Sequence, residues 1–342
     1  MMELTELCSL FTDGARAKAL KSLISDRKSR RFALTGLAGS APAMLFASLH
    51  SGKRPVLVAA DDPDAAGYLY HDLCQILGQD KVSILPSGYK RDIRYGQPDP
   101  PQQILRTEAL GAVSSLSARF IVSCPEGLAE TVPAPSRLEE ASLLLRKGGR
   151  MRMSDAVDRL VQLGFVRTDY VYEPGQYSRR GSILDVFSFS HELPYRIDFF
   201  DDEIDSVRTF NVETQLSEEQ TDSAGIVGGM HEDTGSEVSF LEYLDKDSII
   251  LCRDTDWLLS RVREIAAGEI SAAVIESGEG DTDAMSHTVD ADRFAARLES
   301  LRIGLYGTSP RTGEGTDRID FDCTPQALYH KNFDIISKSF TQ

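Results

Sequence analysis

A glycine-containing turn at residues 35–44, TGLAGSAPAM, has the setting of a phosphate-binding loop. A strand-like run precedes it and an apolar helical pattern follows it, which is the order that the motif G-x-x-x-x-G-K-[ST] requires. In a working loop, backbone N–H groups surround the phosphates, the Lys contacts the β- and γ-phosphates, and the hydroxyl holds Mg²⁺. Counted from Gly36, the second glycine is Ala41, the hydroxyl residue is Ala43, and the Lys is Pro42, which also lacks a backbone N–H. The turn keeps the shape of the motif without its phosphate-binding groups, so we expect no nucleotide or other cofactor.

The composition is that of a soluble protein of two or three domains. The chain has 342 residues, of which 41% are hydrophobic and 26% charged, in the usual range for globular proteins. No apolar run approaches the roughly 18 residues of a membrane span, and the first residues lack the apolar segment of a signal peptide. The cysteines occur singly, without a C-x-x-C pair, at Cys8, Cys74, Cys124, Cys252 and Cys323. We therefore expect a reduced, cytoplasmic protein without a structural metal.

The charge of the chain is concentrated in its second half. From residue 181 onward, 33 acidic residues outnumber 13 basic residues, a net charge of −20. Residues 1–180 carry a net charge of +4, so the whole chain carries −16. The acidic second half of the chain would repel DNA phosphates, which argues against strong nonspecific binding of nucleic acid by the whole chain. It is equally the composition of an acidic, solvated surface that aids solubility.

The first 130 residues alternate between strand and helix patterns. Short apolar runs typical of strands lie at 30–34, 54–60, 81–87 and 118–125, and longer helical patterns lie at 4–25, 43–50, 62–77 and 102–116. This alternation predicts a parallel, doubly wound sheet with helices on both faces.

The rest of the chain divides into a strand-rich segment and a return to the first pattern. Two prolines in TVPAPSRLEE, residues 131–140, predict a linker. A helical pattern and several strands with turns at EPG, RRG and SHELP follow, which is typical of a small α+β domain. The last part has few strands and is expected to complete the first sheet. We therefore predict a lobe made of residues 1–132 and 219–342, with 133–218 as an inserted domain.

Residues 173–217, EPGQYSRRGSILDVFSFSHELPYRIDFFDDEIDSVRTFNVETQLS, contain a long and specific pattern. This segment resembles the amino-terminal, UvrB-like module of the bacterial transcription-repair coupling factors, the Mfd family. The turn GLAGSAPA and the ending TPQALYHKNFD (324–334) are similar to that family as well, so the resemblance covers nearly the whole chain. It implies an α/β fold: a degenerate P-loop NTPase-like parallel-sheet lobe in two sequence pieces, with an inserted small α+β domain.

The resemblance also implies a function. The chain would be a non-catalytic module that recruits UvrA in nucleotide excision repair, within a longer protein that is an ATP-dependent DNA translocase. Partners would be UvrA and the remaining domains, with RNA polymerase and DNA engaged only through domains that follow this module. The alternative is a nucleotide-dependent DNA-processing module like the helicase UvrB. In UvrB a tyrosine-rich hairpin clamps DNA, but the corresponding residues 86–103 offer only Tyr89 and Tyr95, a weak platform for stacking bases.

The inserted domain carries the predicted partner-binding residues. Carried over by position, the UvrA contacts of the family fall on Arg180, Arg196 and Phe200. Arginine offers a planar fork of donors to carboxylates, and an exposed Phe can anchor an interface. Positions 196, 198 and 200 share one face of a strand. The alternative interpretation is that Phe200 belongs to the core and that the arginines are merely solvated.

Other polar residues offer less chemistry. His71 and His191 have no partner at the spacing of a metal site or a catalytic triad. The acidic segment FFDDEIDS, residues 199–206, could supply paired carboxylates, but consecutive side chains of a strand point to opposite faces. We therefore predict no catalytic and no metal-binding residues.

Overall fold

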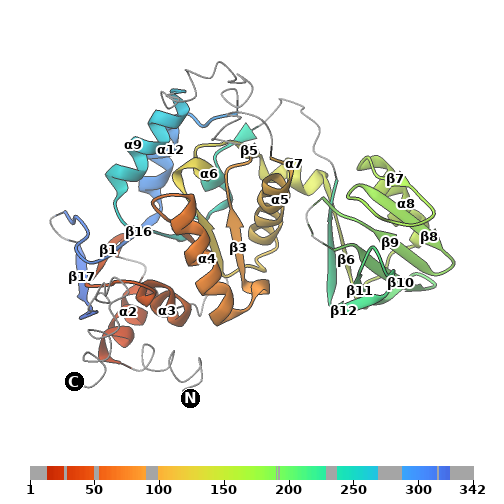
Figure 1. Cartoon of the computed structure of the whole chain (residues 1–342), viewed down its shortest axis with the longest axis horizontal. Helices are drawn as coiled ribbons and strands as arrows, with labels where there is room; N and C mark the ends of the chain where they lie inside the picture. The colour runs from red at the N-terminus through yellow and green to blue at the C-terminus, as the bar shows by residue number, and fades with distance from the viewer. Residues whose placement is uncertain are drawn as a thin grey trace, which may run out of the picture.

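The computed structural model describes residues 14–26, 29–49, 54–89, 99–189, 191, 193–228, 237–268, 287–313 and 316–323. Its larger part is built on a seven-stranded parallel sheet (Figure 1). The strands are β1 (Arg31–Thr35), β2 (Val56–Ala59), β3 (Val82–Leu85), β4 (Phe120–Ser123), β15 (Ile249–Cys252), β16 (Arg302–Tyr306) and β17 (Asp317–Asp320). Their order across the sheet is β17-β1-β16-β15-β2-β4-β3, with every neighbouring pair parallel. Strands from both ends of the chain therefore share one sheet, and β1 lies between two strands from the last 45 residues or so of the chain.

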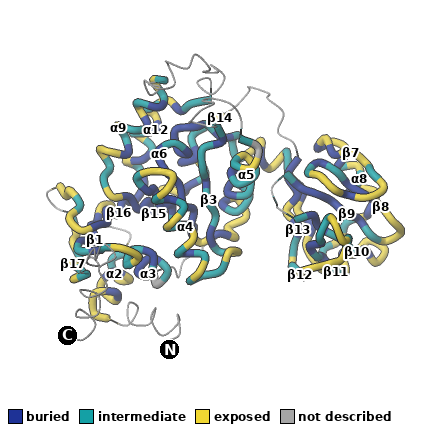
Figure 2. The backbone as a smooth tube through the Cα atoms, viewed as in Figure 1, coloured by how far each residue is buried: buried dark blue, intermediate teal, exposed yellow. Residues whose placement is uncertain are grey.

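Helices cover both faces of this sheet. The helices of the larger part are α2 (Ala15–Ser25), α3 (Ala41–Leu49), α4 (Pro63–Leu77), α5 (Pro100–Ser114), α6 (Pro125–Leu128), α9 (Thr255–Ala266) and α12 (Ala291–Ser300), with short 3-10 helices η1 (Gln79–Lys81) and η2 (Phe240–Tyr243). One hydrophobic cluster joins the sheet to α2, α3 and α4, and a second joins its other face to α5, α6, α9, α12 and η2. Neighbouring residues of β1 enter opposite clusters, since Leu34 packs in the first and Ala33 in the second. The predicted doubly wound α/β arrangement is confirmed; β4, β15 and β16 are buried throughout, whereas the edge strand β17 is largely exposed (Figure 2).

The two prolines at 133 and 135 do not form an irregular linker as predicted. Residues Val132–Pro133 form the short strand β5, which pairs with β14 (Glu237–Val238), and Pro135 begins helix α7 (Pro135–Glu140). Proline is favoured in the first turn of a helix, where its missing N–H would have no intrahelical partner. The same residue type that ends a strand therefore starts a helix here.

A second sheet forms the smaller part, at one end of the molecule in Figure 1. Its strands are β7 (Val166–Arg167), β8 (Gln176–Arg180), β9 (Ile183–Val186), β10 (Tyr195–Phe200), β11 (Glu203–Phe210) and β12 (Ser217–Thr221). They lie in the order β12-β11-β10-β9-β8-β7 and pair antiparallel except for β7 with β8. Helix α8 (Met153–Gln162) and the ribbon of β6 (Ser142–Arg146) with β13 (Ser223–Val227) bury one face of this sheet.

Among the described helices of the whole chain, none has the length and apolarity to cross a membrane.

The domain boundaries at 132/133 and 218/219 stay predictions. Strand β13 lies beyond the second of them, yet it pairs with β6, and its Ala224 and Ile226 pack in the core of the smaller part. We therefore propose that the inserted unit extends to about the end of β13.

Limited proteolysis tests this division. Cleavage on both sides of the inserted unit should release a folded fragment that includes β6 to β13, because that fragment holds its own hydrophobic core. The two remaining pieces should stay together on a sizing column, since β1 is paired on both sides with β16 and β17. Intact-mass analysis of the separated peaks identifies the pieces. A stable carboxy-terminal fragment that elutes alone would contradict the division.

Candidate functional site

The turn after β1 is closed by other parts of the chain itself. The N–H groups of Gly36 and Leu37 donate to the carbonyl oxygens of Thr308 and Gly307, at 3.1 and 3.0 Å. Gly36 has a φ of 70°, and a Cβ atom there would collide with the carbonyl oxygen of Phe321. Glycine is therefore needed at position 36 for the close approach of the chain's own backbone, whether or not a phosphate is bound.

The positions that carry chemistry in a phosphate-binding loop face other surroundings here. Ala43, at the hydroxyl position, is 1% exposed and packs in the cluster with α2 and α4. On the neighbouring strand β17, Asp320 accepts hydrogen bonds from the Thr35 hydroxyl and, at 2.7 Å, from Arg318 Nε. These two hydrogen bonds, the first above all, lower the pKa of Asp320, so a carboxylate stands beside the turn at neutral pH. The ion pair with Asp320 also holds the Arg318 guanidinium at the sheet edge, so this cation is not offered to a phosphate.

The segment predicted as the counterpart of a DNA-clamping hairpin is described only at its two ends. Tyr95 and residues 324–334 lie outside the described residues. Tyr89 stacks on His287 with ring centroids 6.3 Å apart, and the carboxylate of Glu130 accepts the Gly88 N–H at 2.8 Å. The first end of the segment is therefore attached to the body of the larger part.

A buried carboxylate organises one face of the smaller sheet. Asp185 on β9 is 1% exposed, and it lies beside Arg196 of β10 in the antiparallel register. Arg196 holds both of its oxygens, from Nε to Oδ1 at 2.7 Å and from Nη2 to Oδ2 at 2.9 Å. Arg180 at the end of β8 forms an ion pair with Oδ2 of the same carboxylate. Two guanidinium groups thus share one carboxylate, which leaves a net charge of +1.

The two predicted arginines differ in how much of them is available to a partner. Arg196 also donates from Nη1 to the carbonyl oxygen of Gln215 at 2.9 Å, and its guanidinium carbon lies 4.3 Å from the ring centroid of Phe210. Its side chain is 13% exposed, whereas that of Arg180 is 39% exposed. Arg180 lies over the ring of Tyr170, 4.9 Å from its centroid. Arg180 therefore keeps donors for a partner, while most donors of Arg196 are used within the domain.

Phe200 is the most exposed large apolar side chain on the smaller sheet, at 78%. It ends β10 and is followed by a tight turn in which Asp201 has a φ of 59°, a left-handed conformation that Asp tolerates. Along β10 the side chains alternate, with Arg196 and Asp198 on the accessible face and Ile197 in the core. The shared face predicted for positions 196, 198 and 200 is confirmed, and the alternative that Phe200 belongs to the core is wrong. We call Tyr170, Arg180, Asp185, Arg196 and Phe200 the arginine face.

The weaker candidates are not gathered into a site in the described part of the chain. His71 is exposed on α4, and His191 packs its ring on Tyr195 at 4.7 Å. Among the described residues, no group of three or more His, Cys, Asp or Glu side chains could hold a metal ion. Burial raises the pKa values of the Cys124 and Cys252 thiols to about 12, so both stay protonated at neutral pH and are weak nucleophiles.

Comparison with known proteins finds one matching family model and several similar proteins. Residues 143–231 match the family model described as the UvrB interaction domain. The transcription-repair-coupling factor of Escherichia coli K12 is 31% identical over 196 residues, which are 57% of this chain and 17% of that protein. Those of Bacillus subtilis 168 and Myxococcus xanthus are 27% and 29% identical over 194 and 220 residues, which are 56% and 60% of this chain and 16% and 18% of those proteins.

The chain is similar to one part of the transcription-repair-coupling factors. It spans about one sixth of the length of the relatives named above. Arg180, Asp185, Arg196 and Phe200 all lie within the range that matches the UvrB interaction domain, which runs from the second residue of β6 to beyond the end of β13. Asp185 was not among the residues predicted to act, although the alternation of β9 and its pairing with β10 place it beside Arg196.

Asp185 should be required for the stability of the smaller part. Asp185→Ala leaves two guanidinium groups without their carboxylate, one of them largely buried, and should lower the free energy of unfolding by about 3–5 kcal/mol. Phe200→Ala, on the same sheet face, should change it by less than about 0.5 kcal/mol because the ring is already in solvent. Urea denaturation followed by circular dichroism measures both. Equal stability of the Asp185→Ala variant and the unmodified chain would show that the carboxylate is dispensable.

Proposed function

We propose that this chain is a non-catalytic module that recruits UvrA in nucleotide excision repair, with the arginine face as the contact surface. The observation that carries the proposal is the match of residues 143–231 to the UvrB interaction domain, combined with an exposed Phe200 on the same sheet face as a positively charged cluster. An aromatic side chain with Arg neighbours is the usual composition of an interface hot spot.

Each residue of the arginine face has a distinct proposed role. Phe200 buries its ring against the partner, and Arg180 donates to a carboxylate of the partner. Arg196 acts indirectly, because its donors hold Asp185 and the Gln215 carbonyl in place. Apolar side chains next to the cluster extend the surface, since Tyr170 is 49% exposed and Leu216, which follows Gln215, is 69% exposed.

The relatives are several times longer than this chain, and their other activities would belong to other parts of a longer protein. We propose that ATP-driven translocation on DNA, and contacts with RNA polymerase and DNA, use those other domains. A cytoplasmic location fits this role, because the proposed partners act on the chromosome.

Binding to UvrA should depend on the exposed members of the arginine face. Phe200→Ala should weaken binding about thirtyfold, the effect of losing a hot spot worth about 2 kcal/mol, without lowering the melting temperature. Arg180→Ala should weaken binding about tenfold, and its contribution should shrink with added salt because exposed charges are screened over about 8 Å at physiological ionic strength. Arg196→Ala should lower both binding and stability. Isothermal titration with purified UvrA, beside melting curves, gives the affinities. Undiminished binding by folded Phe200→Ala and Arg180→Ala proteins would place the contact surface elsewhere.

The larger lobe should neither bind nor hydrolyse ATP. The motif positions for Lys and the hydroxyl hold Pro42 and Ala43, and two N–H groups of the turn already donate to carbonyl oxygens of the chain. Equilibrium dialysis with labelled Mg-ATP should show no binding at millimolar concentration, and Pro42→Lys alone should create no activity, because the hydroxyl is still missing. Saturable, Mg-dependent turnover would instead support the alternative, a nucleotide-dependent DNA-processing module.

A further inference from the structure

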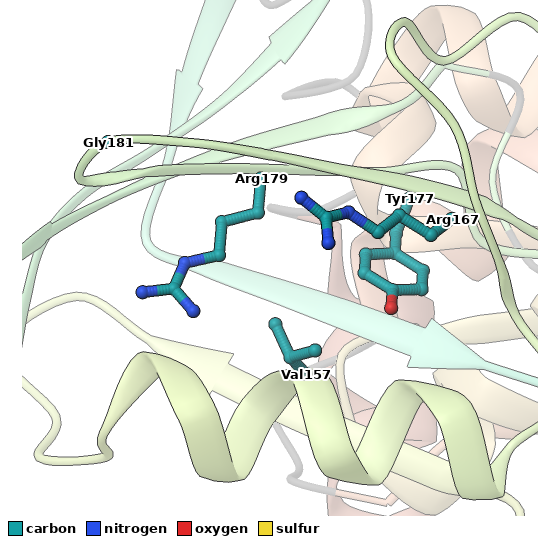
Figure 3. A pocket seen from close by; sticks show the side chains of 5 residues that line it. All are labelled: Val157, Arg167, Tyr177, Arg179 and Gly181. Carbon is teal, nitrogen blue, oxygen red and sulfur yellow. The ribbon is translucent and has the colours of Figure 1, made fainter.

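A hollow of about 270 Å³ lies between helix α8 and the edge of the smaller sheet, outside the arginine face. Its walls are Val157 of α8, Arg167 of β7, Tyr177 and Arg179 of β8, and Gly181 of the following turn. We call it the edge hollow. Figure 3 shows the two arginine side chains projecting from the sheet edge above the helix, with the Tyr177 ring beside them.

Two arginines line the edge hollow, and neither forms an ion pair with a described carboxylate. Arg180 and Arg196 share Asp185, but in the described part of the chain neither Arg167 nor Arg179 forms an ion pair. Both are exposed residues, in a protein whose net charge is −16. Two such guanidinium groups at one hollow favour an anionic ligand.

Tyr177 adds a hydrogen-bonding group to the edge hollow. The residue as a whole is 4% exposed, but its hydroxyl oxygen is not among the described side-chain atoms that are buried without a partner, so the hydroxyl remains accessible to solvent. Figure 3 shows this hydroxyl directed toward α8 at the edge hollow. A tyrosine hydroxyl that no other protein group holds can donate a hydrogen bond to a ligand. An acceptor oxygen between the arginines and the helix would receive this hydrogen bond.

The position of the edge hollow identifies the source of the anion. A second hollow, of about 280 Å³, shares Arg167 and Arg179 with the first and extends to Tyr170 and Arg180 of the arginine face, with Asp169 as its one acidic lining residue. A protein that covers the arginine face therefore reaches the edge hollow without a break. Nucleic acid is a poorer candidate, because the acidic chain as a whole repels a polyanion.

We propose that the edge hollow binds a carboxylate side chain of the protein that docks on the arginine face. Arg167 and Arg179 donate to the two carboxylate oxygens, and the Tyr177 hydroxyl donates to one of them. This inference rests on the proposed function, since the partner is UvrA, and it adds a second anchor at the sheet edge.

Matched variants test the second anchor by titration with UvrA. Arg179→Gln and Arg167→Gln should each weaken binding about tenfold, and the weakening should diminish at high salt. Tyr177→Phe removes one hydroxyl and should weaken binding about threefold with an unchanged melting temperature. Arg293→Gln, an exposed arginine on α12 at the other end of the molecule, is the control and should bind normally (Figure 1).

The outcomes separate this inference from the proposed function. If Phe200→Ala and Arg180→Ala lose affinity while Arg167→Gln, Arg179→Gln and Tyr177→Phe bind normally, the edge hollow is not an anchor and the proposed function stands. If the unmodified chain does not bind UvrA, both fail together. If Arg293→Gln weakens binding as much as Arg179→Gln, the effect is one of overall charge and the assignment to the edge hollow is wrong.

Discussion

The pairing of β1 with β16 on one side and β17 on the other is the constraint on which the rest of the structure depends. It joins strands from near both ends of the described chain in one sheet, so the smaller part, which lies between β4 and β15 in the sequence, must leave this sheet and return to it. This pairing also determines the conformation and the hydrogen bonds of the turn after β1. The segment that follows β17 passes so close to Gly36 that only glycine fits, and backbone hydrogen bonds to residues 307–308 use the donors of the turn. The turn keeps the shape of a phosphate-binding loop for reasons of packing.

The same arrangement leaves the smaller part free to present a surface. Its sheet has α8 and the β6–β13 ribbon on one face and the arginine face on the other. On that face a single buried carboxylate holds two arginines, and the cost of burying Asp185 is offset because both of its oxygens are hydrogen-bonded. The excess of one positive charge and the exposed ring of Phe200 follow from this local geometry. A face of this kind suits recognition of an acidic partner better than it suits chemistry.

Much of the fold and part of the site could be predicted from local patterns. Apolar runs such as those of β2 and β4 and the helical periodicity of α4 are properties of neighbouring residues, and they indicated the doubly wound sheet. Two-residue alternation placed Arg196 and Phe200 on one face of β10. The prolines at 133 and 135 misled because proline both interrupts strands and begins helices, and the choice between the two depends on whether the following residues can pack, as Leu138 does here.

The sequence by itself determined that the turn after β1 lacks the Lys and the hydroxyl of a phosphate-binding loop, because Pro42 and Ala43 occupy those positions. It also determined which side chains alternate along each strand. Only the tertiary structure decided which side chains meet. Asp185 became the partner of Arg196 through strand register, Arg167 and Arg179 came together through the parallel pairing of β7 with β8, and Gly36 acquired its role from residue 321, far along the chain. The physical reason is that periodicity is set by the backbone over a few residues, whereas contacts between distant residues follow from how whole elements pack.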